Sequence, residues 1–316
     1  MTSPRVLVAD PLADGGLQLL QSRLEVLLPR DESSLREAVP SSDALIVRSR
    51  TRVTSDLLDR GSRLRLVARA GIGVDNIDVD AATARGILVI NAPLGNVRST
   101  AEHTMALIFA LARRVTAADR AVRDGNWKTG YEGMQLSGKR LGVVGVGKIG
   151  RQVAAMASAL GLEVLAHDPY LPEVAWPDLG LCPVPFETLL SEADIVTVHV
   201  PLLPETRGLI GAEQMGRMKA GAYLVNCARG GLVDEAALAG ALASGHIAGA
   251  ALDVFEREPL RDSPLLSAPN LILTPHVAAS TSEAQAQVST DVALAVLDFF
   301  AGNPPAFPVN PSVLGA

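Results

Sequence analysis

Cysteine is scarce in this sequence, and its two cysteines, Cys182 and Cys227, are far apart. Two such thiols provide neither a disulfide framework nor the paired Cys or His spacing of a metal site. No run approaches the ~20 consecutive apolar residues of a membrane-spanning helix, and the first apolar stretch ends at Asp10, too early for a secretory signal. We therefore expect a cytoplasmic protein without a metal site and without a membrane anchor.

A surplus of basic charge is also missing. The 316 residues include 28 Lys and Arg against 34 Asp and Glu, which gives a net charge of -6 at pH 7. Because phosphate backbones are held by clustered Lys and Arg, this balance argues against a nucleic-acid partner. With 48% hydrophobic residues the composition is that of a globular chain, and its length is sufficient for two domains.

Short apolar runs alternate with helical patterns along most of the chain, and continuous apolar runs are typical of parallel strands covered on both faces. In the first part of the chain we expect strands at 5–10, 43–49, 64–70 and 86–91. In the second part we expect strands at 140–145, 163–168, 194–200, 222–226, 247–254 and 271–274. Long helical patterns at 97–123 and 281–302 bracket the second array, which predicts one α/β domain inserted into another.

The stretch LGVVGVGKIG, residues 141–150, fits two phosphate-binding patterns. Read from Gly142 it is G-x-x-x-x-G-K, but a nucleoside-triphosphate loop needs Ser or Thr after the Lys to hold magnesium, and Ile149 stands there. Read from Gly145 it is G-x-G-x-x-G, the dinucleotide fingerprint, between an expected strand and an expected helix. The dinucleotide pattern is favoured because residues 143–144 continue the strand.

In the dinucleotide interpretation Gly145 closes the turn, Gly147 lets the backbone approach the pyrophosphate, and Gly150 lets the helix pack on the strand. Asp168 ends the next expected strand, where a carboxylate accepts the ribose hydroxyls and repels a 2′-phosphate. The sequence therefore predicts NAD rather than NADP. The competing interpretation of Asp168 is a turn-forming residue before Pro169.

Hydride transfer to such a cofactor requires a substrate anchor and a group that moves the hydroxyl proton. Arg229 and His276 each follow an expected strand, where ligands bind in open α/β sheets. Arg clamps carboxylates with paired hydrogen bonds, and His exchanges protons near neutral pH. Glu258 is a candidate partner for His276, although Glu256 is equally near. A surface Arg, a structural His and a solvated turn at 256–259 are the competing interpretations.

The motifs that surround these residues resemble those of the D-isomer-specific 2-hydroxyacid dehydrogenases, and within that family they are most similar to phosphoglycerate dehydrogenases. They are LIVRSRTRVT (45–54), RAGIGVDNIDVDAAT (69–83), GVVGVGKIG (142–150), HDP (167–169), VHVPLLPETRGLI (198–210), NCARGGLVDE (226–235), GAALDVFEREP (249–259) and NLILTPHVAAST (270–281). The resemblance implies two doubly wound parallel-sheet domains. A Rossmann NAD-binding domain, 96–284, is expected to interrupt a flavodoxin-like substrate domain, 1–95 plus 285–316.

The resemblance also assigns roles to residues. It implies that Arg229 anchors substrate, that His276 exchanges the hydroxyl proton, and that Glu258 pairs with His276. The cofactor positions that it implies are Gly145, Gly147, Lys148, Ile149, Gly150, Asp168, His199, Pro201, Thr206, Cys227, Ala228, Asp253 and Ala278. The substrate-facing positions that it implies are Arg48, Ala70, Gly71, Ile72 and Gly73. Ala278 departs from the family's usual HLGAST motif by one methyl group.

By the same resemblance we expect NAD-dependent oxidation of a D-2-hydroxy acid, with 3-phosphoglycerate in serine biosynthesis as the first choice. Arg48, Arg50 and Arg69 are candidate cations for its phosphate group. A glyoxylate or hydroxypyruvate reductase is the alternative enzyme, and an NAD-sensing corepressor is the alternative outside enzymology. We further expect a homodimer formed through the NAD-binding domain. Because the chain ends at Ala316, we expect neither a C-terminal regulatory domain nor serine feedback.

Overall fold

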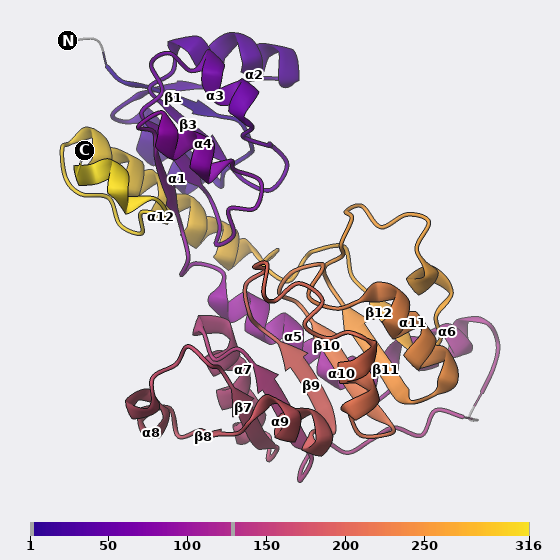
Figure 1. Cartoon of the computed structure of the whole chain (residues 1–316). Coiled ribbons are helices and arrows are strands. Elements are labelled where there is room, and N and C mark those ends of the chain that lie inside the picture. Colours follow the sequence, from indigo (N-terminus) through magenta and orange to yellow (C-terminus); the bar gives the residue numbers. More distant parts are fainter. Residues whose placement is uncertain (1–2, 128–129, 316) are drawn as a thin grey trace. The chain divides into compact units, whose positions relative to one another are not determined.

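The structure of the chain is a computed structural model that describes residues 3–127 and 130–315 (Figure 1). It divides into two compact units. Unit 1 comprises Met1–Asn96 and Ser280–Ala316, and unit 2 comprises Val97–Ala279. Residues 1–2, 128–129 and 316, which the expected domain ranges include, lie outside the described residues.

Unit 1 contains a parallel sheet with the strand order β2-β1-β3-β4-β5. Its strands are β1 (Arg5–Val8), β2 (Glu25–Leu27), β3 (Ala44–Val47), β4 (Leu66–Arg69) and β5 (Leu88–Asn91). This is the order of flavodoxin-like sheets, as the resemblance to the dehydrogenase family implies. The short strand β2 was not expected, because it has only three residues, of which Glu25 is exposed and Val26 and Leu27 are half-buried.

Helices cover both faces of the unit 1 sheet. They are α1 (Asp14–Gln21), α2 (Glu32–Ala38), α3 (Ser55–Arg60), α4 (Val79–Ala84) and α12 (Ser282–Phe300), with short 3-10 turns η1 (Val39–Ser41) and η4 (Pro311–Gly315). Leu20 of α1 and Val292 of α12 belong to the apolar cluster on one face, and Leu35 of α2 and Leu57 of α3 to the cluster on the other. The C-terminal helix α12 therefore completes the core of the N-terminal sheet.

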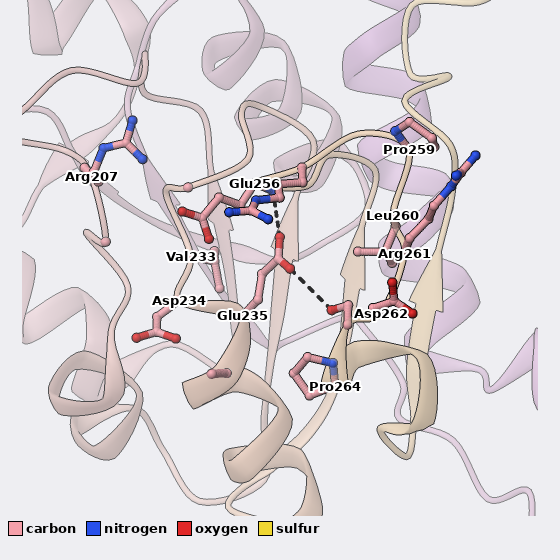
Figure 2. A pocket seen from close by; sticks show the side chains of 15 residues that line it. Arg207, Val233, Asp234, Glu235, Glu256, Pro259, Leu260, Arg261, Asp262 and Pro264 are labelled. Atoms are coloured by element: carbon pink, nitrogen blue, oxygen red, sulfur yellow. Dashed lines mark hydrogen bonds between the residues drawn. The ribbon is translucent and has the colours of Figure 1, made fainter.

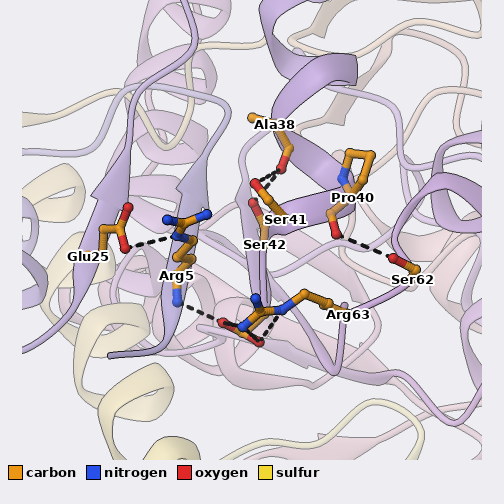
Figure 3. Close-up of polar contacts among 9 residues, drawn as sticks. Arg5, Glu25, Ala38, Pro40, Ser41, Ser42, Ser62 and Arg63 are labelled. Atoms are coloured by element: carbon orange, nitrogen blue, oxygen red, sulfur yellow. Dashed lines mark hydrogen bonds and ion pairs between the residues drawn. The ribbon is translucent and has the colours of Figure 1, made fainter. Parts of the chain in front are cut away.

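Asp43 fixes the beginning of the unit 1 sheet. Its carboxylate accepts a hydrogen bond from the backbone N–H of Arg5 at 2.8 Å and forms an ion pair with Arg63 at 3.0 Å (Figure 3). The Arg5 side chain in turn pairs with Glu25 of β2. These contacts join β2, β1 and β3 at the amino ends of the strands. They stabilise unit 1 and do not involve the loops at the carboxyl ends of the strands.

Unit 2 contains a seven-stranded parallel sheet with the order β12-β11-β10-β9-β6-β7-β8. Its strands are β6 (Arg140–Val144), β7 (Glu163–His167), β8 (Cys182–Pro183), β9 (Ile195–Val198), β10 (Ala222–Asn226), β11 (Ile247–Leu252) and β12 (Leu271–Leu273). The order reverses at β6, which is the topological switch of a Rossmann sheet. The predicted fold class, a Rossmann domain and a flavodoxin-like domain, is confirmed.

The helices of unit 2 form two layers around its sheet. They are α5 (Val97–Ala112), α6 (Val115–Arg123), α7 (Lys148–Ala159), α8 (Trp176–Leu179), α9 (Phe186–Glu192), α10 (Ala212–Arg217) and α11 (Glu235–Ser244), with 3-10 turns η2 (Glu173–Ala175) and η3 (Pro264–Ser267). One apolar cluster joins α5 and α7 to the sheet, and a second joins α9, α10 and α11 to the opposite face. Both faces of the strands are therefore buried, which explains their continuous apolar sequences.

The expected single helix over 97–123 is wrong in one respect, because it is broken into α5 and α6. Arg114 adopts a left-handed backbone with φ of 51°. The carbonyl group of Ala112 accepts a hydrogen bond from the N–H of Met134 at 2.7 Å. The last turn of α5 is thus closed by a distant segment instead of by continuation of the helix.

Candidate active site

The glycine-rich loop lies at the carboxyl end of β6, where the dinucleotide pattern places it. Gly145 follows the strand with φ of 92°, and Gly147 caps α7. A β-carbon on Gly150 would overlap the carbonyl oxygen of Gly145, so only glycine lets α7 approach the turn this closely. A β-carbon on Gly147 would meet no atom within 4 Å, so the backbone there faces open space. The loop therefore fits a pyrophosphate bound at a helix N-terminus.

Asp168 follows β7 and lies beside this loop. Its Oδ2 accepts a hydrogen bond from the N–H of Val146 at 2.9 Å, and its Oδ1 accepts one from the N–H of Tyr170 at 3.0 Å. The side chain is only partly buried. The sequence-predicted acid is therefore held next to the dinucleotide fingerprint by two backbone contacts.

His276 and Glu258, which are 18 positions apart, form a close pair. Nδ1 of His276 lies 2.8 Å from Oε2 of Glu258, and Oε1 of Glu258 accepts a hydrogen bond from the N–H of Phe255 at 3.1 Å. The two side chains are 46% and 36% exposed. The neighbouring candidate, Glu256, instead donates its N–H to Glu235 at 2.7 Å. The structure thus selects Glu258 as the partner of His276.

The protonation of this pair follows from its surroundings. Burial alone would raise the pKa of Glu258, but the hydrogen bond and charge of His276 and the Phe255 N–H outweigh it, and the pKa is lowered. An ionised carboxylate only accepts hydrogen bonds, so Nδ1 of His276 carries a proton. In the neutral imidazole the lone pair is then on Nε2. The pair is arranged to act as a base through Nε2.

The loop that carries Arg229 packs directly against the loop that carries Glu258. Asn226, buried at the end of β10, donates to the carbonyl group of Arg229 at 2.8 Å and accepts from the N–H of Ala228 at 2.9 Å. A β-carbon on Gly230 would overlap the carbonyl group of Phe255. This close approach brings the Arg229 loop to the segment that orients Glu258.

Asp253 connects the ends of β11 and β12. Its side chain is fully buried, and its carboxylate accepts hydrogen bonds from the Thr274 hydroxyl at 2.6 Å and from the N–H groups of Val277 and Ala278 at 2.9 Å each. Its backbone oxygen accepts the N–H of His276 at 2.8 Å. Burial favours the neutral acid, but these donors together with His103 outweigh it, so the pKa of Asp253 is lowered. Asp253 therefore holds the loop that presents His276.

Three further cofactor candidates, His199, Thr206 and Cys227, lie in the segments that follow β9 and β10. Burial lowers the pKa of His199 to about 4, and its Nε2 lies 3.0 Å from the Thr197 hydroxyl, so this histidine is neutral at pH 7. Thr206 donates to the carbonyl group of Pro201 at 2.7 Å and closes the turn after β9. Burial raises the pKa of Cys227 to about 12, so its thiol is not ionised at neutral pH.

The predicted substrate-facing residues belong to unit 1, and the catalytic candidates belong to unit 2. Asp10, which is buried, accepts the N–H of Arg48 at 2.6 Å, and the Asn76 amide donates to the carbonyl group of Arg48 at 2.7 Å. In the 70–73 loop, the Arg69 guanidinium donates to the carbonyl group of Ala70 at 2.6 Å and covers Gly71. Both loops are thus held in fixed shapes at the carboxyl ends of β3 and β4.

A separate cavity of about 680 Å³ lies beside the loop that carries Glu258 (Figure 2). It is lined by Arg207, by the start of α11 and by residues 256–257 and 259–264, and it includes none of Arg229, Glu258 and His276. Figure 2 shows the Glu235 carboxylate among these lining residues. It accepts hydrogen bonds from the N–H of Glu256 at 2.7 Å and from the Ser263 hydroxyl at 3.5 Å. Glu235 therefore braces the loop that carries Glu258.

Neither a metal cluster nor a membrane helix is found in the part of the chain that the structure describes. No three His, Cys, Asp or Glu residues within 3–127 and 130–315 are grouped to hold a metal ion. Within the same ranges, no helix has the length and apolar character needed to cross a membrane.

Sequence reasoning missed four residues that shape the site, namely Asn226, Thr274, His103 and Glu235. Asn226 and Thr274 stand at strand ends, which is the signal that would have identified them. His103 and Glu235 lie on helices, and only the fold brings their side chains to the strand ends.

The sequence resembles those of D-isomer specific 2-hydroxyacid dehydrogenases. The family model of the D-isomer specific 2-hydroxyacid dehydrogenase, NAD binding domain, matches residues 105–278. The D-3-phosphoglycerate dehydrogenase of Mycobacterium leprae (strain TN) is 48% identical over 305 residues, which are 96% of this chain and 58% of that protein. The chain thus spans little more than half the length of this curated relative.

Two crystal structures resemble the chain over almost its whole length. The TT0316 protein from Thermus thermophilus has a TM-score of 0.89 and 37% identity, with coverage of 96% of this chain and 99% of that one. A glyoxylate reductase from Paecilomyes thermophila has a TM-score of 0.88 and 30% identity, with coverage of 99% and 100%.

Proposed function

The chain belongs to the D-isomer specific 2-hydroxyacid dehydrogenases, and from this premise we propose that it oxidises D-3-phosphoglycerate to 3-phosphohydroxypyruvate, with reduction of the keto acid as the reverse reaction. The observation that carries the proposal is the 2.8 Å contact between His276 Nδ1 and Glu258 Oε2, which leaves Nε2 as the base. The choice of substrate is supported by the 48% identity to a D-3-phosphoglycerate dehydrogenase. This oxidation would serve serine biosynthesis.

In the proposed reaction His276 Nε2 removes the proton of the C2 hydroxyl group as the hydride leaves C2. NAD, when bound, would supply the acceptor for that hydride. The imidazolium that forms is stabilised by the ionised Glu258, whose lowered pKa keeps it charged. Arg229 holds the substrate carboxylate through two N–H groups and polarises the developing carbonyl group. In the reverse direction the protonated His276 returns the proton to the oxygen atom.

NAD is the cofactor predicted from Asp168, and the match to the family's NAD-binding domain confirms it. We propose that the backbone of Gly145, Gly147 and Gly150 faces the pyrophosphate and that Asp168 accepts the adenosine ribose hydroxyls. The other cofactor contacts that we propose come from Lys148, Ile149, His199, Pro201, Thr206, Cys227, Ala228, Asp253 and Ala278. The ranges 96–284 and 1–95 plus 285–316 would be the cofactor and substrate domains.

A phosphorylated substrate needs cations beyond Arg229, and we propose that arginines of unit 1 supply them. Arg48 and Arg50 stand on the loop that Asp10 and Asn76 hold in place. Arg69 stands at the end of the neighbouring strand β4. The backbone of residues 70–73 would contact the carboxylate group of the substrate.

The second candidate function is reduction of glyoxylate or hydroxypyruvate. It is supported by the TM-score of 0.88 to a glyoxylate reductase. These substrates have no phosphate group and would leave Arg48, Arg50 and Arg69 without a ligand.

Steady-state kinetics separates these candidates. Initial rates are measured with 3-phosphoglycerate, 3-phosphohydroxypyruvate, hydroxypyruvate, glyoxylate and pyruvate, each with the NAD and the NADP forms of the cofactor. We expect the highest kcat/KM for the phosphorylated pair with NAD or NADH. Equal or higher kcat/KM for an unphosphorylated acid would exclude the phosphoglycerate assignment and favour the reductase.

We also propose that the protein is a homodimer formed through the cofactor domain. Exposed apolar side chains on α5 and α6 support this, because Phe109, Val115 and Val122 are 40%, 53% and 55% exposed. Sedimentation equilibrium of the 33.0 kDa chain should give twice the chain mass, and a Phe109→Asp, Val122→Asp variant should give the monomer mass. A wild-type monomer would contradict the proposal.

A further inference from the structure

The mechanism proposed above gives no task to His103, a histidine on α5 that reaches the ends of β11 and β12. Its Nε2 lies 3.2 Å from the Thr274 hydroxyl oxygen and 3.6 Å from Oδ1 of Asp253. The side chain is 22% exposed, whereas that of Asp253 is fully buried. A histidine therefore stands beside the buried carboxylate that holds the His276 loop.

The direction of each hydrogen bond in this cluster can be deduced. Asp253 is ionised, because its pKa is lowered by His103, Thr274 and two backbone N–H groups against the effect of burial. An ionised carboxylate only accepts, so the single hydroxyl proton of Thr274 points to Asp253 at 2.6 Å. Thr274 then accepts the other hydrogen bond, and Nε2 of His103 must carry a proton. The relay runs from His103 through Thr274 to Asp253.

This relay ends on the backbone that presents the proposed base. The Asp253 carboxylate holds the N–H groups of Val277 and Ala278, and its backbone oxygen holds the N–H of His276. His276 has φ of 53°, a left-handed conformation that is unfavourable for a non-glycine residue and needs support from its surroundings. If the Asp253 carboxylate lost its hydrogen bond from Thr274, the backbone at 276–278 could relax, and the His276 ring would move.

We propose that His103 is a positioning residue for His276. It donates Nε2–H to Thr274 and thereby fixes the Thr274 hydroxyl on Asp253, which keeps the 276–278 backbone in the conformation that aims Nε2 of His276. His103 touches neither substrate nor cofactor in this proposal, and it acts only through Asp253 and Thr274. The inference rests on the proposed role of His276 as the base.

The test compares two variants of His103. His103→Gln retains an N–H donor near the Nε2 position, whereas His103→Leu removes it. The matched control is His246→Leu. His246 immediately precedes β11, which Asp253 immediately follows, and its Nε2 donates a hydrogen bond to the carbonyl group of Met215 at 2.9 Å. Thr274→Val, alone and combined with His103→Leu, tests whether the effect passes through the hydroxyl.

Kinetic and exchange measurements are made on each full-length variant. We expect His103→Leu to lower kcat by on the order of 10- to 100-fold, because small displacements of a catalytic group have effects of that size. KM for 3-phosphoglycerate should change less than about threefold, since uniform binding of the substrate is not affected. Hydrogen–deuterium exchange in the 274–280 peptide should accelerate, while exchange in the β9 peptide stays as in the wild type. His103→Gln should restore kcat to within about fivefold of wild type.

Specific results would overturn the proposal. They are wild-type kcat and exchange in His103→Leu, equal losses in the Leu and Gln variants, or equal losses in His246→Leu. Additive effects of His103→Leu and Thr274→Val on kcat would also overturn it, because residues acting in one relay are not additive. If His103→Leu does not fold, Thr274→Val and His103→Gln decide by the same criteria.

Failure of the proposed reaction can be distinguished from failure of the proposed role of His103. A wild-type protein that turns over no 2-hydroxy acid would refute the reaction. The exchange of the 274–280 peptide in His103→Leu would still report whether His103 holds the loop.

Discussion

Gly230 lies against Phe255 so closely that no side chain fits between the two backbones. This contact joins the loop of Arg229 to the segment that gives its N–H to Glu258. One backbone contact therefore joins the loop of the proposed substrate anchor to the segment that orients Glu258, the partner of the proposed base. The requirement is for close approach, because Gly230 is not among the glycines with positive φ.

Replacing Gly230 should consequently impair both loops. We expect Gly230→Ala to lower kcat/KM by on the order of 100-fold and to destabilise the fold by about 1–3 kcal/mol, since the β-carbon must displace the Phe255 backbone. The measurements are steady-state kinetics and urea unfolding. Gly240→Ala on α11 is the control, because its β-carbon would meet no atom within 4 Å and helix interiors favour Ala by about 1 kcal/mol. Equal changes of kcat/KM and of unfolding free energy in the two variants would contradict the proposed importance of the Gly230–Phe255 contact.

The acidic groups of the site predict how stability depends on pH. The pKa values of Glu258 and Asp253 are both lowered in the folded chain. Each carboxylate therefore contributes stability that is present above its unfolded pKa, about 4, and is lost as the pH falls through its folded pKa. We expect the free energy of unfolding to decrease below about pH 4, and to decrease less steeply in Glu258→Gln. Urea unfolding between pH 6 and pH 3 measures both slopes, and identical slopes would contradict the role of Glu258.

Asp168 should determine the choice between NAD and NADP. We expect Asp168→Asn to lower the ratio of kcat/KM for NAD to that for NADP by at least about tenfold, because the carboxylate no longer repels a 2′-phosphate. The amide oxygen can still accept one of the two backbone N–H groups. Asp178→Asn on α8 makes the same charge change at an exposed position and should leave the ratio unaltered. A preference that is the same in all three proteins would remove Asp168 from the cofactor site.

Much of this architecture could be predicted from the sequence, because its strong signals are local. Continuous apolar runs marked the buried strands, and the glycine spacing before an apolar helix marked the loop at β6. The edge strand β8 was missed, since its two residues include a proline and are exposed. The break between α5 and α6 was missed because the contact that causes it comes from Met134, outside the helix.

The candidate site was predictable to a similar extent and for related reasons. His276, Arg229 and Asp168 each follow a strand, so their positions came from the strand pattern. The choice between Glu256 and Glu258 depended on side-chain direction, which the local sequence leaves open. Asn226, Thr274 and Glu235 form hydrogen bonds with neighbouring loops, and His103 reaches Thr274 from a helix more than 150 positions away in the chain. Such contacts exist only after folding.

The central claim is that Nε2 of His276 is the base of a D-2-hydroxy acid dehydrogenase. The most direct test measures kcat for 3-phosphoglycerate oxidation and the NADH dissociation constant in the wild type and in His276→Ala. We predict that kcat falls by roughly 10²- to 10⁴-fold, the usual contribution of a general base, while NADH affinity is largely retained. A variant with near wild-type kcat would contradict the account.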